Sequence, residues 1–91
     1  MKAQLSVEEQ WEKVWEICEF SEKLQNARRE PHRRVIELAL ADRNPEVRAA
    51  VIQNRAAVRA DIAQLRQDPI RHVANAAKLA LIQNYPIGAE V

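Results

Sequence analysis

Few residues in this 91-residue chain are suited to catalysis, and their spacing does not bring them together. The two histidines, His32 and His72, are far apart in the sequence and neither stands in a spacing typical of a metal site. The only glycine is Gly88, so the glycine-rich loops that hold nucleotide phosphates are absent. The glutamates between residues 8 and 19 recur at helical spacing, which is typical of a solvated helix face. The sequence therefore predicts a protein that is not an enzyme and has no metal or cofactor.

The single cysteine, Cys18, excludes an intrachain disulfide and a cysteine-based zinc site. It could be a reactive thiol, which requires exposure and nearby positive charge, or a small apolar side chain in a core. Its place in the middle of an apolar helical stripe favours the second interpretation. The absence of disulfides, of a signal-peptide pattern at the N-terminus and of an apolar run of about 20 residues predicts a cytoplasmic protein without membrane contact.

Binding is the chemistry that remains, and arginine is the residue best suited to it here. The formal net charge is only +1, but the segment RREPHRR concentrates Arg28, Arg29, His32, Arg33 and Arg34 within residues 28–34. Their guanidinium groups could bind the carboxylates of an acidic protein or the phosphates of a nucleic acid. The segment could equally be a solvated connection whose first two arginines stabilise the end of the preceding helix.

Three arginines, Arg33, Arg48 and Arg71, each follow a proline by two or three residues, in the first turn of an expected helix. A cation there is disfavoured by the helix dipole, so each is expected to have an acidic partner. The acids nearby in sequence are Glu30, Asp42, Glu46 and Asp68. Without such partners, the three arginines would form an anion-binding stripe. Asp42 stands six residues before Arg48, but no acid stands six residues before Arg71, so Arg71 and His72 are the pair more available to a partner.

The aromatic residues Trp11, Trp15 and Phe20 fall in one stretch of the chain. Trp11 is expected in the core. Trp15 and Phe20 flank the apolar stripe on opposite sides, so one or both could remain exposed and anchor an interface. The alternative is that this helix packs across the rest of the protein as a cap and buries all three.

These residues must be positioned by helices. One glycine and four prolines leave little material for β-turns, and the length suits one domain, so we expect a single all-α domain over residues 1–91. The first helix is expected over residues 6–25, with Ser6 as its N-cap and Glu9 completing a capping box. On a helical wheel its apolar arc contains Val7, Trp11, Val14, Ile17, Cys18, Ser21 and Leu24.

Four shorter helices are expected within residues 31–84, and residues 85–91 are expected to be irregular. Pro31, Pro45 and Pro69 predict three helix starts, because proline is favoured in the first helical turn. The pattern of Val58, Ile62 and Leu65 predicts a further helix that ends near Arg66. Two stretches, NPEVRAAVIQN and DPIRHVANAAKLALIQN, begin with a capping residue and proline and both end in IQN. This internal similarity is typical of helical repeats.

Residues 38–69, LALADRNPEVRAAVIQNRAAVRADIAQLRQDP, resemble a leucine-rich repeat variant (LRV) or, more broadly, a HEAT-like repeat. The resemblance is carried by Leu40, Asp42, Pro45, Val47, Arg48, Val51, Asn54, Ile62, Leu65, Asp68 and Pro69. It implies a short right-handed α-solenoid of about five helices. It also implies a ladder of aspartate and arginine between neighbouring repeats, with Asp42 and Arg48 in those positions. The first helix lies outside the resemblance.

We therefore expect a non-catalytic protein-interaction module, a small adaptor or inhibitor of a larger protein. The alternative is binding of nucleic-acid phosphates through an arginine-rich surface. The candidate partner-binding residues are Arg28, Arg29, His32, Arg33, Arg34, Arg71, His72, Trp15 and Phe20. Apolar residues near the C-terminus, namely Leu79, Leu81, Ile82, Tyr85 and Ile87, predict a homodimer or a docked partner at that face.

Overall fold

A computed structural model gives the structure of the protein, and residues 4–84 are described. These residues form six α-helices and one short 3-10 helix, without a strand. The elements are α1 (Val7–Ile17), α2 (Phe20–Arg29), α3 (Arg33–Leu40), α4 (Pro45–Ala50), η1 (Val51–Gln53), α5 (Arg59–Leu65) and α6 (Arg71–Asn84). The all-α prediction is confirmed. The expectations for Tyr85, Ile87 and the tail lie outside the described residues.

The helix predicted over residues 6–25 is two helices in the structure, so the prediction of about five helices was also too low. Ser6 and Glu9 form the predicted capping box: the Glu9 backbone N–H donates to Ser6 Oγ at 3.1 Å, and the Ser6 N–H donates to Glu9 Oε1 at 3.2 Å. The chain then leaves the helix at Cys18, whose φ of −68° and ψ of 137° are extended. Glu19 is also extended, and its N–H donates to Glu22 Oε1 at 3.1 Å. This contact starts α2 in a new direction.

The other helix starts follow the expected polar residues, with small shifts. Asn44 caps α4 through a bond from the Glu46 N–H, and Pro45 is the first helical residue, as predicted. The helix expected to start at Pro31 begins at Arg33 instead, because His32 is the N-cap. Similarly, α6 begins at Arg71, two residues after Pro69.

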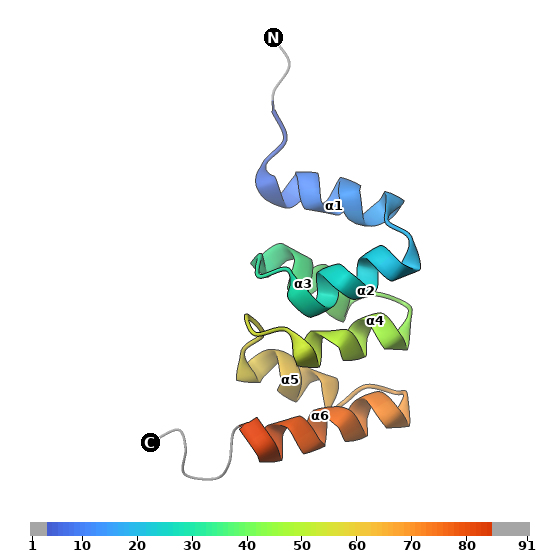
Figure 1. Ribbon diagram of the computed structural model, residues 1–91, viewed down its shortest axis with the longest axis vertical. Coiled ribbons are helices and arrows are strands. Elements are labelled where there is room, and N and C mark those ends of the chain that lie inside the picture. Colours follow the sequence, from blue (N-terminus) through green and yellow to red (C-terminus); the bar gives the residue numbers. More distant parts are fainter. Residues whose placement is uncertain (1–3, 85–91) are drawn as a thin grey trace.

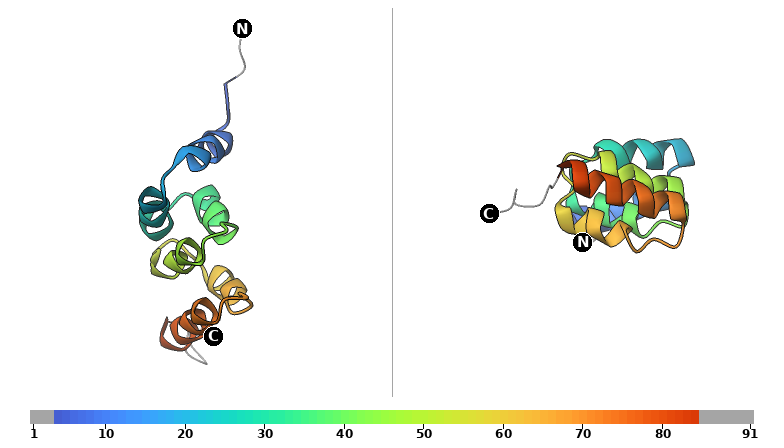
Figure 2. Two further views of the ribbon diagram at one scale, coloured as in Figure 1. Left: turned by 90° about the vertical axis from the view of Figure 1, so that its right-hand side faces the viewer. Right: turned by 90° about the horizontal axis from the view of Figure 1, so that it is seen from below.

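The helices run back and forth and lie in two layers (Figure 1, Figure 2). In the left view of Figure 2, α1, α3 and α5 form one layer, and α2, α4 and α6 form the other. Within the layers α1 packs against α3, α2 against α4, and α4 against α6. Between the layers α3 contacts α2 and α4, and α5 contacts α6. The helices from α2 to α4 are therefore held by several neighbours, whereas α1 packs mainly against α3.

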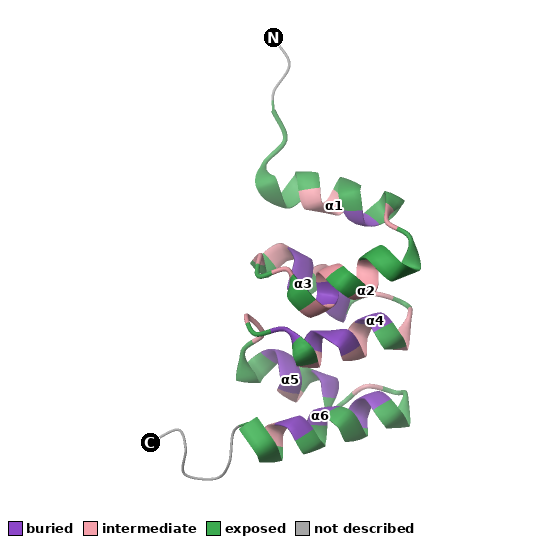
Figure 3. Cartoon of the chain, viewed as in Figure 1, coloured by how far each residue is buried: buried purple, intermediate pink, exposed green. Residues whose placement is uncertain are grey.

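The core lies between the layers and is most complete in the middle of the stack (Figure 3). The largest fully buried side chains are Ile36, Val35, Val47, Val51 and Val73. They come from α3, α4, η1 and α6. Burying each such aliphatic side chain contributes about 1.5–3 kcal/mol, so these five side chains are expected to contribute strongly to stability.

Asn54, which was expected only to end a helix, is a buried polar link between neighbouring helices. Its Nδ2 donates to the carbonyl oxygens of Ala27 at 3.0 Å and Glu30 at 2.8 Å, at the C-terminal end of α2. Its Oδ1 accepts from the Ala56 N–H at 2.8 Å. The amide thus satisfies carbonyls that the end of α2 leaves without helical partners, and it fixes the η1–α5 connection against α2.

Candidate functional site

The apolar face of α1 is covered on one side only. Trp15 is buried, and Trp11 is half-buried against the core. Val7, Val14 and Ile17, which were expected to be buried, are instead 51%, 39% and 81% exposed. The break at Cys18 explains the error, because α2 crosses into the other layer and leaves this side of α1 without a neighbouring helix.

Trp15 was predicted as a possible interface anchor, and its burial rules out that role. Its indole Nε1–H donates to Asp42 Oδ2 at 3.1 Å. The Lys23 ammonium lies 5.6 Å from the centre of the ring and 3.3 Å from the same carboxylate oxygen. Trp15 therefore joins α1 to the connection between α3 and α4. The contacts of Trp15 thus stabilise the fold.

Arg48 was expected to pair with Asp42, but its carboxylate partner is Asp68. The Arg48 Nε and Nη2 donate to the two Asp68 oxygens at 2.6 and 3.0 Å. Asp42 contributes its backbone carbonyl, which accepts from Arg48 Nη1 at 2.8 Å. The Arg48 guanidinium lowers the pKa of Asp68 below its ordinary value, mainly through these hydrogen bonds. A cation of α4 is thus linked to the aspartate before α6.

Arg33 also has an acidic partner, although not one of those expected. Its guanidinium makes a bidentate contact with Asp61 of α5, and the Nη1–Oδ2 distance is 2.8 Å. Asp61 is buried, and Arg33 lowers the pKa of its carboxyl by hydrogen bonding, which outweighs the opposing effect of burial. The sequence pattern did not identify Asp61, because nothing local shows that α5 starts beside α3.

Arg34 and His32 are engaged within the fold as well. Arg34 donates to Glu37 at 3.1 Å and forms an ion pair with Glu12 of α1 at 3.1 Å. The Nδ1 of His32 accepts from the Arg34 N–H at 3.1 Å, and its ring lies 6.4 Å from that of Trp11. Of the arginine-rich segment, residues 32–34 therefore serve mainly to join α3 to α1 and α5.

Arg71 and His72, the pair expected to be available, differ from each other. The His72 Nε2 lies 3.0 Å from Glu46 Oε1, with both side chains exposed. Arg71 is exposed and has no ion pair with any described residue. His72 thus links α6 to α4. Within the described residues, the guanidinium of Arg71 has no acidic partner, so Arg71 is the member of this pair that stays available.

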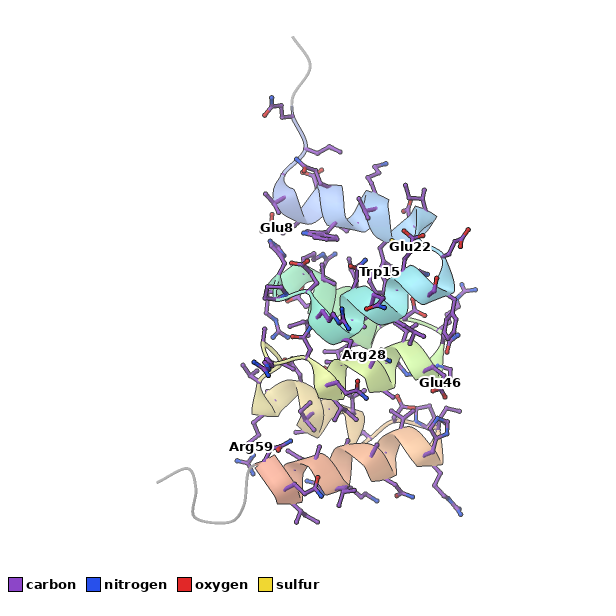
Figure 4. All side chains as sticks on the ribbon, viewed as in Figure 1. Glu8, Trp15, Glu22, Arg28, Glu46 and Arg59 are labelled. Atoms are coloured by element: carbon purple, nitrogen blue, oxygen red, sulfur yellow. The ribbon has the colours of Figure 1, made fainter. Side chains whose placement is uncertain are left out.

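Arg28, Arg29 and Phe20 remain free for a partner, and they lie on one surface with a residue that the sequence did not single out, Arg55. Arg28, Arg29, Gln53 and Arg55 line one open pocket of about 340 Å³. Arg28 and Gln53 also line an adjoining pocket of about 420 Å³, together with Phe20, Leu24, Glu46, Ala49 and Ala50. We call the two together the α2/α4 groove. Figure 4 shows Arg28 beside α4 and Glu46 near the start of that helix.

Cys18 is half-buried and ends α1. Asn26 Nδ2 approaches its Sγ at 3.9 Å, and burial raises the pKa of the thiol above its ordinary value. This environment disfavours the thiolate, in agreement with the interpretation of Cys18 as a packing residue. Among residues 4–84, no three side chains of the His, Cys, Asp and Glu types gather into a metal-binding cluster. In the same residues, no helix has the length and apolar character needed to cross a membrane.

No protein-family model matches this chain. No curated protein and no solved structure is significantly similar to it. The functional argument therefore rests on the geometry of the described residues.

Proposed function

We propose that the chain is a short right-handed α-solenoid of the HEAT-like or LRV-like type and that it acts as a non-catalytic protein-interaction module. The two layers of alternating helices support this proposal. So do the contacts that link each helix pair to the next, Lys23 to Asp42 and Arg48 to Asp68. In both, a cation of the second-layer helix meets the aspartate of the connection that leads to the next helix of that layer.

The observation that carries the proposal is the half-covered apolar face of α1. Val7, Val14 and Ile17 expose apolar surface beside a well-packed core, and such surfaces are typical of protein–protein contacts. The same helix carries several exposed glutamates, among them Glu8, Glu9 and Glu16, which give α1 a net negative charge. The partner expected here is an amphipathic segment whose apolar residues are flanked by lysine or arginine, because its charges would complement those of α1.

The proposal is tested by co-purification of partners from the native host with wild-type protein and with V14D/I17D. We expect the double substitution to remove a bound protein while helical content and thermal stability stay unchanged. V58D/I70D is the matched control, since it places two acids on exposed apolar positions outside both α1 and α6. Equal recovery of every partner with the wild type and V14D/I17D would contradict the assignment to α1.

Nucleic-acid binding, the alternative function, depended on Arg28, Arg29, Arg33, Arg34, Arg48 and Arg71. Acids neutralise three of these, Arg33, Arg34 and Arg48. The remaining cations do not form the continuous stripe that tracks a phosphate backbone, so the geometry gives this function less support than protein binding. A gel-shift titration across salt separates the two functions, because phosphate contacts weaken steeply as salt rises.

Self-association through α6 stays a prediction. Leu79 and Ile82 are exposed on its outer face, but so are Arg71, Asn75 and Lys78. Light scattering over a wide concentration range, with L79D/I82D for comparison, tests whether this mixed surface forms a dimer.

A further inference from the structure

The three arginines at one end of the α2/α4 groove have no acidic partner among the described residues. Arg28, Arg29 and Arg55 make no ion pair there, whereas Arg33, Arg34 and Arg48 all do. Three guanidinium groups around one pocket repel one another, and no carboxylate lines that pocket. The structure therefore holds concentrated, uncompensated positive charge at this position.

The carbonyl oxygens at the end of α2 offer these arginines few hydrogen-bond acceptors. Arginines in a last helical turn ordinarily interact with the free carbonyl oxygens of that turn. Here the carbonyls of Ala27 and Glu30 already accept from the buried Asn54 amide. The local backbone therefore offers Arg28 and Arg29 fewer acceptors than a helix end usually does.

Arg28 shows the shortage most clearly. Its Nε is buried and has no acceptor. The Nε of Arg34 is in the same state, but the terminal nitrogens of Arg34 donate to Glu37 and Glu12. Arg28 has no such bond within the described residues. The guanidinium of Arg28 is therefore uncompensated within the described residues, and its terminal nitrogens are available to an anion that docks in the pocket.

We propose that Arg28, Arg29 and Arg55, with the Gln53 amide, bind a phosphate monoester on a side chain of a protein partner. A dianionic phosphate offers three acceptor oxygens and matches the planar fork of arginine. The rest of the groove suits a peptide that continues from the phosphate, because Phe20, Leu24 and Ala49 give it an apolar wall. Glu46 at the other end gives the groove a basic and an acidic end, so it sets the direction of the peptide.

A phosphorylated protein fits this surface better than a nucleic acid. Arg28, Arg29 and Arg55 form one cluster that matches one phosphate group, whereas a strand presents phosphates at regular intervals and needs a stripe of cations. The groove also offers a single aromatic ring, Phe20, for stacking. This site is separate from the exposed face of α1 and does not depend on the function proposed for that face.

The first test titrates the protein with inorganic phosphate at constant ionic strength and follows the arginine Nε–Hε signals by nuclear magnetic resonance. We expect saturable shifts for Arg28, Arg29 and Arg55. R28Q and R55Q should each weaken phosphate binding about tenfold or more, since each removes at least one charge-assisted hydrogen bond. R66Q is the matched control, because Arg66 is exposed, lies outside the pocket and carries the same charge. Circular dichroism checks that each variant is folded.

The second test compares a degenerate peptide library centred on phosphoserine with its serine counterpart and with a single-stranded DNA oligonucleotide. Tighter binding of the phosphoserine library, lost in R28Q and R55Q but kept in R66Q, supports the proposal. Three results overturn it. They are the absence of saturable phosphate binding, an equal loss in R66Q, and tighter binding of the oligonucleotide than of the phosphoserine peptides through the same arginines.

Discussion

The middle of the stack and its first helix are built from similar residues but are packed very differently. In α3 and α4 the apolar side chains face neighbours on both sides, and Val35, Ile36 and Val47 are fully buried. In α1 one tryptophan is buried, and the aliphatic side chains are exposed. The ion pairs differ in burial: Asp61, which pairs with Arg33 and joins α3 to α5, is buried, whereas Glu12 of α1, which pairs with Arg34, is partly exposed.

This difference shows that an apolar stripe in the sequence does not by itself predict whether another helix of the same chain covers it. The middle helices use their stripes for stability, because each has a helix before and after it in the stack. The first helix has such a neighbour on one side only, so its other side is free to bind. The measurements below compare the two regions, from the largest expected effect to the smallest.

Two isoleucines give the most direct comparison. Ile36 is 0% exposed in α3 and Ile17 is 81% exposed at the end of α1. I36A is expected to lower the free energy of unfolding by about 2–5 kcal/mol, because it leaves a cavity in the core. I17A is expected to change it by less than about 0.5 kcal/mol. Urea denaturation measures both, and a similar loss in the two variants would show that α1 is covered in solution.

The buried amide of Asn54 gives the second comparison. N54A removes the two bonds to the end of α2 and the bond to the Ala56 N–H. We expect a loss of about 2–3 kcal/mol, because the carbonyls of Ala27 and Glu30 are left without these donors. N75A, on the exposed face of α6, is the control and is expected to be nearly neutral. A neutral N54A would mean that water replaces the amide.

The Arg48–Asp68 pair gives a prediction that depends on pH. The folded-state pKa of Asp68 is lowered from 3.8, so the unfolded chain binds its proton more readily. The stabilisation is therefore present above about pH 4 and is lost as the pH falls through the lowered folded-state pKa. At pH 7, D68N is expected to cost about 1–2 kcal/mol, since one partner of a half-buried, hydrogen-bonded pair is neutralised.

Denaturation at a series of pH values between 7 and 2 checks this prediction. D68N should remove part of the acid sensitivity of the wild type, and so should D61N, because Arg33 lowers the pKa of Asp61 in the same way. Unchanged acid sensitivity in both variants would show that these pairs are not coupled to folding.

The smallest effect is expected for the surface contact between α4 and α6. His72 and Glu46 are both largely exposed, although their atoms approach to 3.0 Å. E46Q should change the free energy of unfolding at pH 7 by less than about 0.5 kcal/mol, because water screens the pair. A loss as large as that of D68N would contradict the distinction between half-buried and exposed ion pairs.

Local signals predicted much of the fold. The capping box at Ser6 and the helix start at Asn44–Pro45 were both predicted from the sequence and are confirmed. These features depend on a few neighbouring residues, so periodicity and capping chemistry are sufficient to find them.

The break after α1 was missed, because neither proline nor glycine marks it. One signal was present: Phe20 lies off the apolar arc of a continuous helix. In the structure Phe20 is the first residue of the new helix α2 and lies in the α2/α4 groove. In this chain, the aromatic residue that falls outside the apolar arc of the first helix lies where the chain changes direction.

The candidate binding residues were only partly predictable. Arg28, Arg29 and Phe20 were predicted to bind a partner, and in the structure they line one groove. Their companion Arg55 comes from the connection after η1, and the partners Asp61 and Asp68 come from later helices. Such pairings depend on how the layers stack, and no local pattern in the chain encodes them.

The extended residues Cys18 and Glu19 also have a consequence for motion. They connect α1 to the rest of the chain without a continuous helix, and Trp15 is the only residue of α1 that is buried. Local opening of α1 can therefore occur without unfolding of the middle helices. Backbone amides of α1 should exchange with solvent faster than those of α3 and α4, and binding of a partner to its exposed face should slow that exchange. The first helix would then become fully protected from exchange only when the proposed partner covers its exposed face.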